Sequence, residues 1–465
     1  MKKNTAKVFL IGAGPGNPDL LTVKAKKILN EVDVVAYDSL ISPALLMNVN
    51  PKAQLIHVGR RGYEKKLRPN LHPSVIKKAK EGKTVARLKS GDPMVFGKAF
   101  EECHELIKSQ VPFEIIPGIT STLGAASTCA FPLTQKGASS ELLFVNGQNL
   151  FKSEYFKDFE GTLVFYMGKK NLSKHCERLV QIGKDPNTPA LYIEGATTIE
   201  QKVIRGNLVT LSNKVQKEAG SSPALFMVGE VLKKYPYLKE NGDFLKPLSH
   251  ARVLVLRSEE GSSPLTKSLK DLGAEIFEVP NITTHFYSTH ATLLKEKKNH
   301  SVNLLFPTKE SVKGFKNLLK EASLDIRSFF KDNWIALNPK AKEAIRELGI
   351  HEDAHPNKSL SSLIFTSQNE KTSHTNIPCY KIESHFPQFR PPQFDLIIAP
   401  NVDSIKLFKE GPWERLLHCT NVLATGQESY SFLKNEGHSK VYMAQENVVS
   451  EIMTLINSSP MRKAL

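Results

Sequence analysis

Residues 87–102 have the sequence RLKSGDPMVFGKAFEE, in which an apolar run ends in a Gly-Asp-Pro turn and then restarts at helical spacing. Polar and apolar residues alternate from 85 to 89, which predicts a strand. Gly91 and Pro93 then interrupt it, because glycine tolerates positive φ and proline cannot continue a ladder. A loop at the carboxyl end of a strand is where α/β proteins usually bind ligands. The same pattern also fits an ordinary turn between a strand and a helix, so this segment alone leaves both interpretations open.

Length and composition predict a soluble protein of two or three domains, since the chain has 465 residues, of which 40% are hydrophobic and 24% charged. No apolar run approaches the roughly 20 residues that a membrane span needs. The first residues, MKKNTAKVFLIGAGPG, have a basic tip and a short apolar run, which Pro15 interrupts early. No small-residue cleavage site follows, so we expect a first strand there and not a signal peptide.

The cysteines and histidines do not form metal-binding motifs in the sequence. An odd number of widely spread cysteines without a CxxC pair favours a reducing cytoplasm and disfavours a zinc or iron–sulfur site. The histidines near the motifs described below have no partner at metal-ligand spacing, so we expect surface or structural roles and no bound metal. These residues are Cys103, Cys129, Cys176, Cys379, Cys419, His57, His72 and His104.

Positive charge is concentrated in the first half of the chain. The net charge is +16, and residues 51–100 hold 13 lysines and arginines against 3 acidic residues. Such a surface would attract a polyanion. Nucleic acid is one candidate, but the basic run has little aromatic interleaving beyond Tyr63, and no nucleic-acid-binding motif accompanies it, so we expect no nucleic-acid partner. A solvated lysine face on residues 77–80 explains part of the charge equally well.

The first half alternates strands and helices, which predicts a largely parallel sheet. Beyond residue 140, the segments ELLFVNG, TLVFYMG, ALYIEG and PALFMVGEV predict further strands in a second lobe that closes over the first. The strands of the first lobe are expected at residues 8–11, 34–37, 55–58, 85–89 and 113–116, and its helices at 20–32, 72–80 and 100–109.

A nicotinamide dehydrogenase is one alternative for the first lobe. Residues 12–17 come close to the GxGxxG pattern, and Asp33 or Asp38 lies at about the distance of a ribose-binding acid. Pro15 argues against this alternative, because it removes an N–H donor that a dinucleotide loop needs. The motifs further along the chain also have no place in that fold.

Five motifs in a fixed order resemble the uroporphyrinogen-III C-methyltransferases of the tetrapyrrole methylase superfamily. They cover roughly the first half of the chain, and together they are far more specific than any one of them. Their sequences are GAGPGNPDLLT (12–22), YDSLISP (37–43), VGRRG (58–62), RLKSGDPMVFGKAFEE (87–102) and PGITS (117–121). The resemblance implies two α/β lobes, an S-adenosyl-L-methionine cofactor, a polycarboxylate tetrapyrrole substrate and a homodimer.

The same resemblance implies the site residues. Matched position by position, Asp38 corresponds to the proton acceptor and Arg60 to a lysine proton donor. Arginine stays charged throughout the working pH range, so we expect Arg60 to bind a carboxylate or to act electrostatically. The implied cofactor contacts are Pro15, Ser90, Gly91, Asp92, Val95, Thr120, Ser121, Met167, Ala196 and Ala224. For Met167, plain core packing is the alternative.

Several positions depart from the family pattern. Ser39 replaces an arginine, Ser90 a glycine, and Ala99-Phe100 a glycine pair, while Gln135-Lys136 stand where His-Arg is usual. The lost arginine and histidine remove expected substrate contacts and therefore bear on the substrate more than on the cofactor. Another tetrapyrrole methylase, or a non-catalytic tetrapyrrole-binding protein, is thus an alternative.

The second half has the same strand and helix rhythm and predicts a parallel α/β domain of two similar lobes. Residues 235–250 are polar, with two prolines and one glycine, which predicts a linker between domains at 1–240 and 251–465. Beyond it, VLVLR, GAEIFEVP and the segments Ala-Leu-Asn-Pro and Ala-Thr-Gly-Gln resemble uroporphyrinogen-III synthase, which cyclises hydroxymethylbilane. The resemblance implies Tyr380 and Ser429 as substrate residues, with a buried core position as the alternative for Tyr380.

The synthase-like half departs further from its family. Residues 341, 399 and 401 are Ala, Ala and Asn where hydroxyls line the family's cleft, and residues 369–377 leave room only for a loop where a helix is expected. It is therefore a slow synthase, a non-catalytic partner or a scaffold. Taken together, the sequence predicts a cytoplasmic, multifunctional enzyme that methylates uroporphyrinogen III to precorrin-2, on the route to sirohaem or cobalamin.

Overall fold

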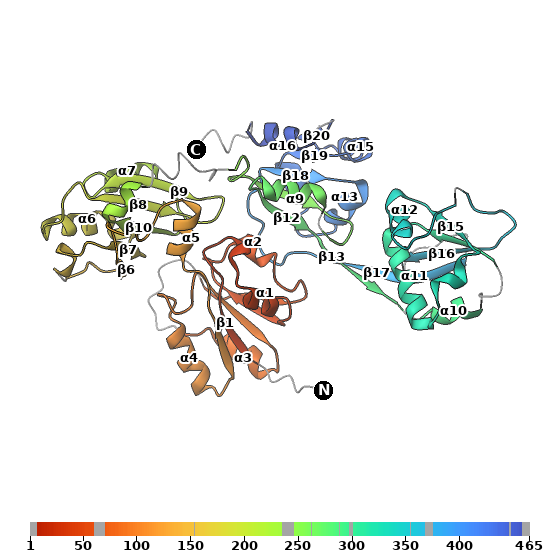
Figure 1. Ribbon diagram of the computed structural model, residues 1–465, viewed down its shortest axis with the longest axis horizontal. Helices are drawn as coiled ribbons and strands as arrows, with labels where there is room; N and C mark the ends of the chain where they lie inside the picture. Colours follow the sequence, from red (N-terminus) through yellow and green to blue (C-terminus); the bar gives the residue numbers. More distant parts are fainter. Residues whose placement is uncertain are drawn as a thin grey trace. The chain divides into compact units, whose positions relative to one another are not determined.

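The computed structural model describes residues 7–59, 70–152, 154–234, 246–261, 263–287, 289–296, 301–353, 355–367, 375–445 and 448–457. The chain falls into two compact units (Figure 1). Unit 1 comprises residues 1–256, 262–279 and 387–465, and unit 2 comprises residues 257–261 and 280–386. Unit 2 is thus an insertion in the second half of the chain.

The first sheet of unit 1 is parallel throughout, as the alternation of strands and helices predicted. One apolar cluster joins one face to α1 (Val23–Leu29) and α2 (Pro43–Leu46), and another joins the opposite face to α3 (Pro73–Lys80) and α4 (Ala99–Lys108). All five strands therefore have their carboxyl ends at one edge. In spatial order they are β3 (Gln54–His57), β2 (Val34–Tyr37), β4 (Val85–Lys89), β1 (Val8–Gly12) and β5 (Phe113–Ile116).

The second sheet is mostly antiparallel, because only its first two strands run in parallel. Helices α6 (Leu172–Gln181) and α7 (Leu211–Glu218) pack on one face, and α5 (Ser121–Thr128), which follows the first sheet in the chain, packs on the other. Helix α5 therefore ties the two lobes together. The strands in order are β6 (Leu142–Asn146), β7 (Thr162–Tyr166), β10 (Ala224–Val228), β8 (Pro189–Glu194) and β9 (Lys202–Asn207).

The third sheet combines strands from both sides of the insertion and is parallel throughout. Helices α9 (Pro264–Asp271) and α16 (Val448–Asn457) share an apolar cluster with it. The later helices of this part are α13 (Val402–Lys409), α14 (Leu416–Cys419) and α15 (Gln427–Asn435). The strands in order are β12 (Glu275–Val279), β11 (Arg252–Leu256), β18 (Leu396–Ala399), β19 (Val422–Ala424) and β20 (Val441–Met443).

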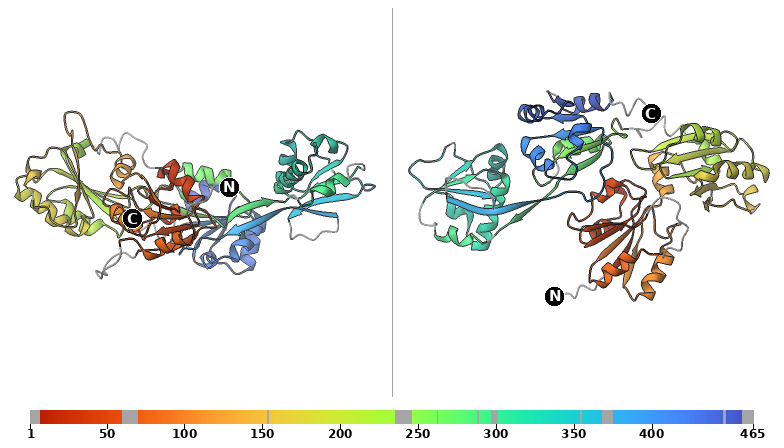
Figure 2. Two further views of the ribbon diagram at one scale, coloured as in Figure 1. Left: turned by 90° about the horizontal axis from the view of Figure 1, so that it is seen from below. Right: turned by 180° about the vertical axis from the view of Figure 1, so that it is seen from behind.

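Unit 2 is one sheet packed with helices α10 (Ala291–Glu296), α11 (Lys309–Ala322) and α12 (Pro339–Arg346). A capping box between Thr308 and Ser311 starts α11. Strands β13 and β17 pair antiparallel as a ribbon, and the other pairs are parallel (Figure 2). The order is β13 (Asn281–Phe286), β17 (Thr375–His385), β16 (Ser362–Ser367), β14 (Asn303–Phe306) and β15 (Asn333–Ala336).

The expected α/β architecture with two lobes in each half is confirmed. Residues 235–245 of the expected linker and residues 369–374 of the expected loop lie outside the described residues. Within the described ranges, no helix has the length and apolarity to cross a membrane, and no three His, Cys, Asp or Glu side chains gather as metal ligands. None of the five cysteines, all of which lie in the described ranges, forms a disulfide bond.

Candidate functional site

The loops that carry the sequence motifs meet at the carboxyl edge of the first sheet. Residues 13–17 follow β1, Asp38 follows β2, residues 90–96 follow β4, and residues 117–120 follow β5. Parallel strands bring these loops to one edge, which is where open α/β sheets bind their ligands. The order of the strands therefore explains why motifs far apart in sequence belong to one site.

Backbone hydrogen bonds join the loop after β1 to the loop after β4. Ala13 N donates to Lys89 O over 2.8 Å, Gly14 N donates to Gly91 O over 3.2 Å, and Gly91 N donates to Gly14 O over 2.8 Å. Gly14 and Gly91 both have a φ of +71°, which non-glycine residues adopt only with strain. The two glycines thus fix how closely these loops approach each other.

The loop after β5 packs directly on the other two. A Cβ atom at Gly12 would lie 2.5 Å from Gly118 N, and a Cβ atom at Gly118 would lie 2.3 Å from Gly91 O. Asp92 holds the third loop in place, because its Oδ2 accepts from Gly118 N over 3.0 Å while its Oδ1 accepts from Met94 N over 2.8 Å. Asp92 therefore orders the site's backbone, whether or not it also contacts a ligand.

Loops of the second lobe reach the same edge. Thr197, with a φ of +68°, accepts through Oγ1 from Asn17 N over 3.1 Å. Gly16 lies against this loop, since a Cβ atom there would be 2.5 Å from Thr198 Cγ2. The two lobes therefore meet where the loop after β1 faces the loop after β8.

Tyr166, at the end of β7, links the second lobe to the start of α5. Its hydroxyl lies 2.8 Å from Thr120 Oγ1 and 3.3 Å from Thr122 N, which donates to it. Its ring lies 5.2 Å from that of Phe96, in the loop after β4. Sequence reasoning missed Tyr166, because a tyrosine before Met167-Gly168 looks like any strand end, and its partners lie more than forty residues earlier.

We expect Tyr166→Phe to weaken binding of S-adenosylhomocysteine by about three- to tenfold, which corresponds to roughly 1 kcal/mol for the lost hydrogen bonds. The phenylalanine ring keeps the contact with Phe96 but leaves Thr120 and Thr122 without their shared partner. Isothermal titration calorimetry measures the effect. Tyr155→Phe is the matched control, because the Tyr155 side chain is 60% exposed, and it should bind as the unmodified chain does. Equal affinity of all three proteins would show that Tyr166 does not order the site.

Four charged side chains form a connected cluster beneath the loop after β4. Arg87 Nη2 lies 3.1 Å from Asp38 Oδ2, and Arg87 Nε lies 3.5 Å from Glu102 Oε1. Lys89 Nζ lies 2.6 Å from the same Glu102 oxygen. Arg87, Lys89 and Glu102 are all less than 10% exposed, and burial lowers the pKa of Lys89 from its ordinary value. Asp38 is the most exposed member, so its carboxylate is the one that a ligand can reach.

The remaining sequence-predicted cofactor residues lie on the same set of loops. Pro15 contacts α5, where a Cβ atom at Gly124 would be 2.6 Å from Pro15 Cγ. The Gly195 N–H donates to Pro223 O, which places Ala196 and Ala224 on adjacent segments. The others are Ser90, which is exposed, Val95, which follows Asp92, Ser121, the first residue of α5, and Met167, which is 41% exposed with a φ of +57°. Because the Met167 side chain is exposed, the alternative in which it only packs in the core is not favoured. Arg60 lies outside the described residues.

The two residues predicted for the synthase-like half are both buried. Tyr380 is 2% exposed in the core of unit 2, and its hydroxyl lies 3.0 Å from Thr308 Oγ1. Ser429 is also 2% exposed, on α15. The core position that the sequence left open for Tyr380 is the one observed, and neither residue's role with a substrate is tested by this arrangement.

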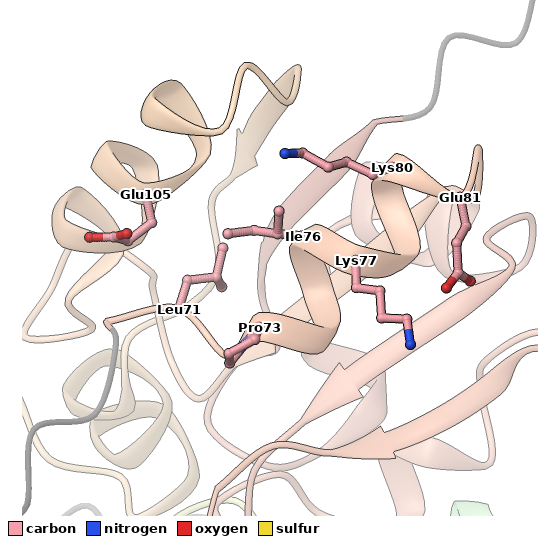
Figure 3. Close-up of a pocket in the computed structure, with 7 residues that line it drawn as sticks. All are labelled: Leu71, Pro73, Ile76, Lys77, Lys80, Glu81 and Glu105. Atoms are coloured by element: carbon pink, nitrogen blue, oxygen red, sulfur yellow. The ribbon is translucent and has the colours of Figure 1, made fainter.

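A pocket of about 530 Å³ lies on the outer side of the first lobe, away from these loops (Figure 3). Ile76 points toward the helix that carries Glu105 and Leu71 points toward Ile76, while Pro73, Lys77, Lys80 and Glu81 complete the lining of the pocket. None of the residues predicted for the cofactor or for catalysis lies there. Its apolar floor explains the pocket as an ordinary gap between α3 and α4.

The groups at the carboxyl edge fit a nucleoside-bearing ligand. Ser90, Thr120 and Ser121 carry hydroxyl groups, and Gly91, Ala196 and Ala224 are small residues that allow other groups to come close to the backbone. Small-molecule sites combine close backbone approach with few polar side chains in this way. One carboxylate, Asp38, stands at the border of the site as a potential base.

Comparisons with known proteins show the family of the chain. Residues 7–212 match the family model described as Tetrapyrrole (Corrin/Porphyrin) Methylases. A uroporphyrinogen-III C-methyltransferase of Bacillus subtilis is 33% identical over 330 residues, which cover 69% of this chain and 67% of the relative. The porphyrin biosynthesis protein HemD of Ruminiclostridium josui is 31% identical over 364 residues, which cover 75% and 71%.

Among solved structures, uroporphyrin-III C-methyl transferase from Thermus thermophilus complexed with S-adenyl homocysteine is 33% identical, with a TM-score of 0.43. The match covers 49% of this chain and 99% of that one. The chain spans about half the length of the siroheme synthases that it also matches. On the sequence relatives and the family model, the chain belongs to the tetrapyrrole methylases, as its five ordered motifs predicted.

Proposed function

We propose that the first half of the chain uses S-adenosyl-L-methionine to methylate uroporphyrinogen III at two ring carbons and thereby makes precorrin-2. The observation that carries this proposal is the convergence of four of the five motifs at one sheet edge, next to an accessible carboxylate. The concentration of basic residues between positions 51 and 100 supports a substrate with eight carboxylates. Relatives named for this reaction support it further.

In this proposal, the cofactor is held mainly by the backbone of the three joined loops of the first lobe and by the facing loops of the second. Thr120 and Ser121 stand at the start of α5, and Met167, Ala196 and Ala224 contribute from the second lobe. S-adenosyl-L-methionine supplies a methyl group that is already electrophilic. The protein's main contribution is then to hold the nucleophilic ring carbon in line with that group, since orientation alone lowers such a barrier considerably.

Asp38 is our candidate for the proton acceptor. Its Oδ1 accepts from Leu40 N over 3.0 Å and its Oδ2 faces Arg87, so both carboxylate oxygens have a fixed direction. When a substituted ring carbon gains the methyl group it becomes quaternary and the macrocycle gains a positive charge, so a proton must leave another position of the macrocycle, and we assign Asp38 to accept it. We assign Arg60 an electrostatic role toward substrate carboxylates, on the strength of the motif alone.

Incubation of the full chain with uroporphyrinogen III and S-adenosyl-L-methionine tests the proposal. We expect a product two methyl groups heavier, which mass spectrometry after oxidation identifies. Retained binding of S-adenosylhomocysteine without any methylated product would instead favour a non-catalytic tetrapyrrole-binding protein. Binding of NADH would favour the dehydrogenase alternative.

A second candidate function, cyclisation of hydroxymethylbilane to uroporphyrinogen III, belongs to residues 251–465. One support is the arrangement of this half in two lobes, since the chain passes from the third sheet into unit 2 and then returns to the third sheet. The other is the relative named HemD, whose match extends beyond the first half. Hydroxymethylbilane incubated with the full chain and S-adenosyl-L-methionine should then give dimethylated type III product. Only unmethylated type I product would mean that this half is inactive and serves as a partner or a scaffold.

The proposed domain limits remain 1–240 and 251–465, with the methylase half as the dimer-forming part and the cytoplasm as the compartment. The lack of disulfide bonds among the described cysteines is compatible with that compartment. Sedimentation velocity of the full chain decides between a monomer and a dimer.

A further inference from the structure

The buried carboxylate of Glu102 is not used in the proposed reaction, yet it occupies the centre of the charged cluster. Glu102 is the fourth residue of α4 and is 3% exposed, whereas its neighbour Glu101 is exposed. A carboxylate is almost never buried to this degree without charged partners. Its partners here are Arg87 and Lys89, which lie two residues apart on β4 and therefore point to the same face of the sheet.

The contacts divide unevenly between the two oxygens of Glu102. Arg87 Nε lies 3.5 Å from Oε1, and Lys89 Nζ lies 2.6 Å from the same atom. Among the described residues, no donor contacts Oε2, although this atom is buried. A buried oxygen without a donor is unfavourable, so a role in stability alone does not explain the arrangement. Residues that keep a buried polar atom without a hydrogen-bond donor are often found at functional sites.

Both partners of Glu102, Arg87 and Lys89, contact residues of the proposed site. Arg87 uses its Nη2 to contact Asp38, so the guanidinium bridges the two carboxylates. Lys89 is the last residue of β4, and its carbonyl oxygen accepts from Ala13 N just before the loop at residues 90–92 begins. One carboxylate thus restrains the candidate base on one side and the start of a cofactor loop on the other.

We propose that Glu102 is a positioning residue for methyl transfer, which acts through Arg87 to fix the orientation of the Asp38 carboxylate. Lys89 is the counter-charge that keeps Glu102 in place. This inference rests on the proposed function, because it assigns Glu102 an effect on the step in which Asp38 takes the proton. Without Glu102, Arg87 keeps its contact with the Leu88 carbonyl oxygen but loses its second carboxylate, and the Asp38 carboxylate is then held less firmly in its direction.

The variant Glu102→Gln keeps the shape and one acceptor oxygen but removes the charge. We expect kcat for methylation of uroporphyrinogen III to fall by about tenfold to hundredfold, which is typical when a reacting group is misplaced by about 1 Å. KM for both substrates and the affinity for S-adenosylhomocysteine should stay within about threefold. Glu105→Gln is the matched control on the same helix, since Glu105 pairs only over 3.8 Å with Lys108 at the surface, and it should leave kcat unchanged.

A double-mutant cycle with Asp38→Asn separates positioning from a general structural role. If Glu102 acts through Asp38, adding Glu102→Gln to Asp38→Asn should not lower kcat further, because residues that act as one unit are not additive. If the two reductions multiply, the inference is overturned. Should Glu102→Gln fail to bind S-adenosylhomocysteine, the same cycle with Arg87→Lys decides, since lysine cannot bridge both carboxylates.

The activity of the unmodified chain separates failure of the proposed function from failure of the inference about Glu102. If it does not methylate uroporphyrinogen III, the proposed function fails and the inference about Glu102 fails with it. If it does methylate this substrate and the effects of Glu102→Gln and Asp38→Asn multiply, only the inference about Glu102 fails.

Discussion

Asp38→Asn should reduce kcat for methyl transfer by about 10²- to 10⁴-fold, the range for loss of a general base. The amide keeps the size of the side chain and an oxygen that can still face Arg87, which lies 3.1 Å from the carboxylate. It cannot accept the proton that the macrocycle loses after methylation. Steady-state rates with uroporphyrinogen III, together with calorimetry on S-adenosylhomocysteine, measure the two effects separately, and we expect the affinity for the latter to change by less than about threefold.

Asp33→Asn is the matched control for this variant. Asp33 lies at the opposite end of the same strand, where its carboxylate accepts hydrogen bonds from Thr84 N and Thr84 Oγ1. Those hydrogen bonds lower the pKa of Asp33, and its carboxylate is remote from the carboxyl edge. Its substitution should leave kcat unchanged. If Asp38→Asn also retained full activity, another group would have to take the proton and the assignment of Asp38 would be wrong.

Gly118→Ala should have the second large effect, a loss of S-adenosylhomocysteine affinity of at least about tenfold. The added Cβ atom would lie 2.3 Å from Gly91 O and 2.7 Å from Gly12 Cα, and both are backbone atoms that cannot rotate away. The three loops must therefore separate, at a cost of about 1–3 kcal/mol or more in stability as well. Calorimetry and thermal denaturation of the full chain measure the two consequences.

Gly426→Ala tests whether any added methyl group has this effect. Gly426 has a φ of −151°, and no atom lies within 4 Å of the position that its Cβ would take. The variant should match the unmodified chain in S-adenosylhomocysteine affinity and thermal stability. Normal affinity of Gly118→Ala would contradict the close packing of the loops after β1, β4 and β5.

The sequence was most informative about local elements of the first lobe. The strand expected at residues 34–37 is β2, that at 113–116 is β5, and the segment at 87–102 is the end of a strand, a loop and a helix. These elements are short, strongly patterned and bounded by glycine or proline. The parallel first sheet followed from their alternation because parallel neighbours need a crossover between them.

The second lobe could not be predicted as well. Strand β9 was missed because its sequence, KVIRGN, is polar and has little apolar alternation. The antiparallel pairing of β8, β9, β10 and β7 depends on contacts between distant segments, which local pattern does not encode. The insertion of unit 2 was hidden for the same reason, since the strand and helix rhythm continues without a break across residues 280 and 386.

The sequence of β4 contains a sign of the charged cluster. Arg87 and Lys89 occupy alternate positions of a strand whose five residues are all buried, so two cations on one face required a buried acid nearby. Glu102 lies one helix turn into the next element and meets that requirement. Tyr166, in contrast, left no signal, because only the fold brings it to Thr120.

The insertion of unit 2 also has a consequence for how the chain is made. Strand β11 is released from the ribosome well before β18, its neighbour in the third sheet, because all of unit 2 is translated between them. Both sheets of the methylase half are already complete in the nascent chain by then, whereas β11, which is buried along its length and apolar from Val253 onward, still has an open edge. Premature termination near residue 390 would leave that edge permanently open, and such products are prone to aggregate.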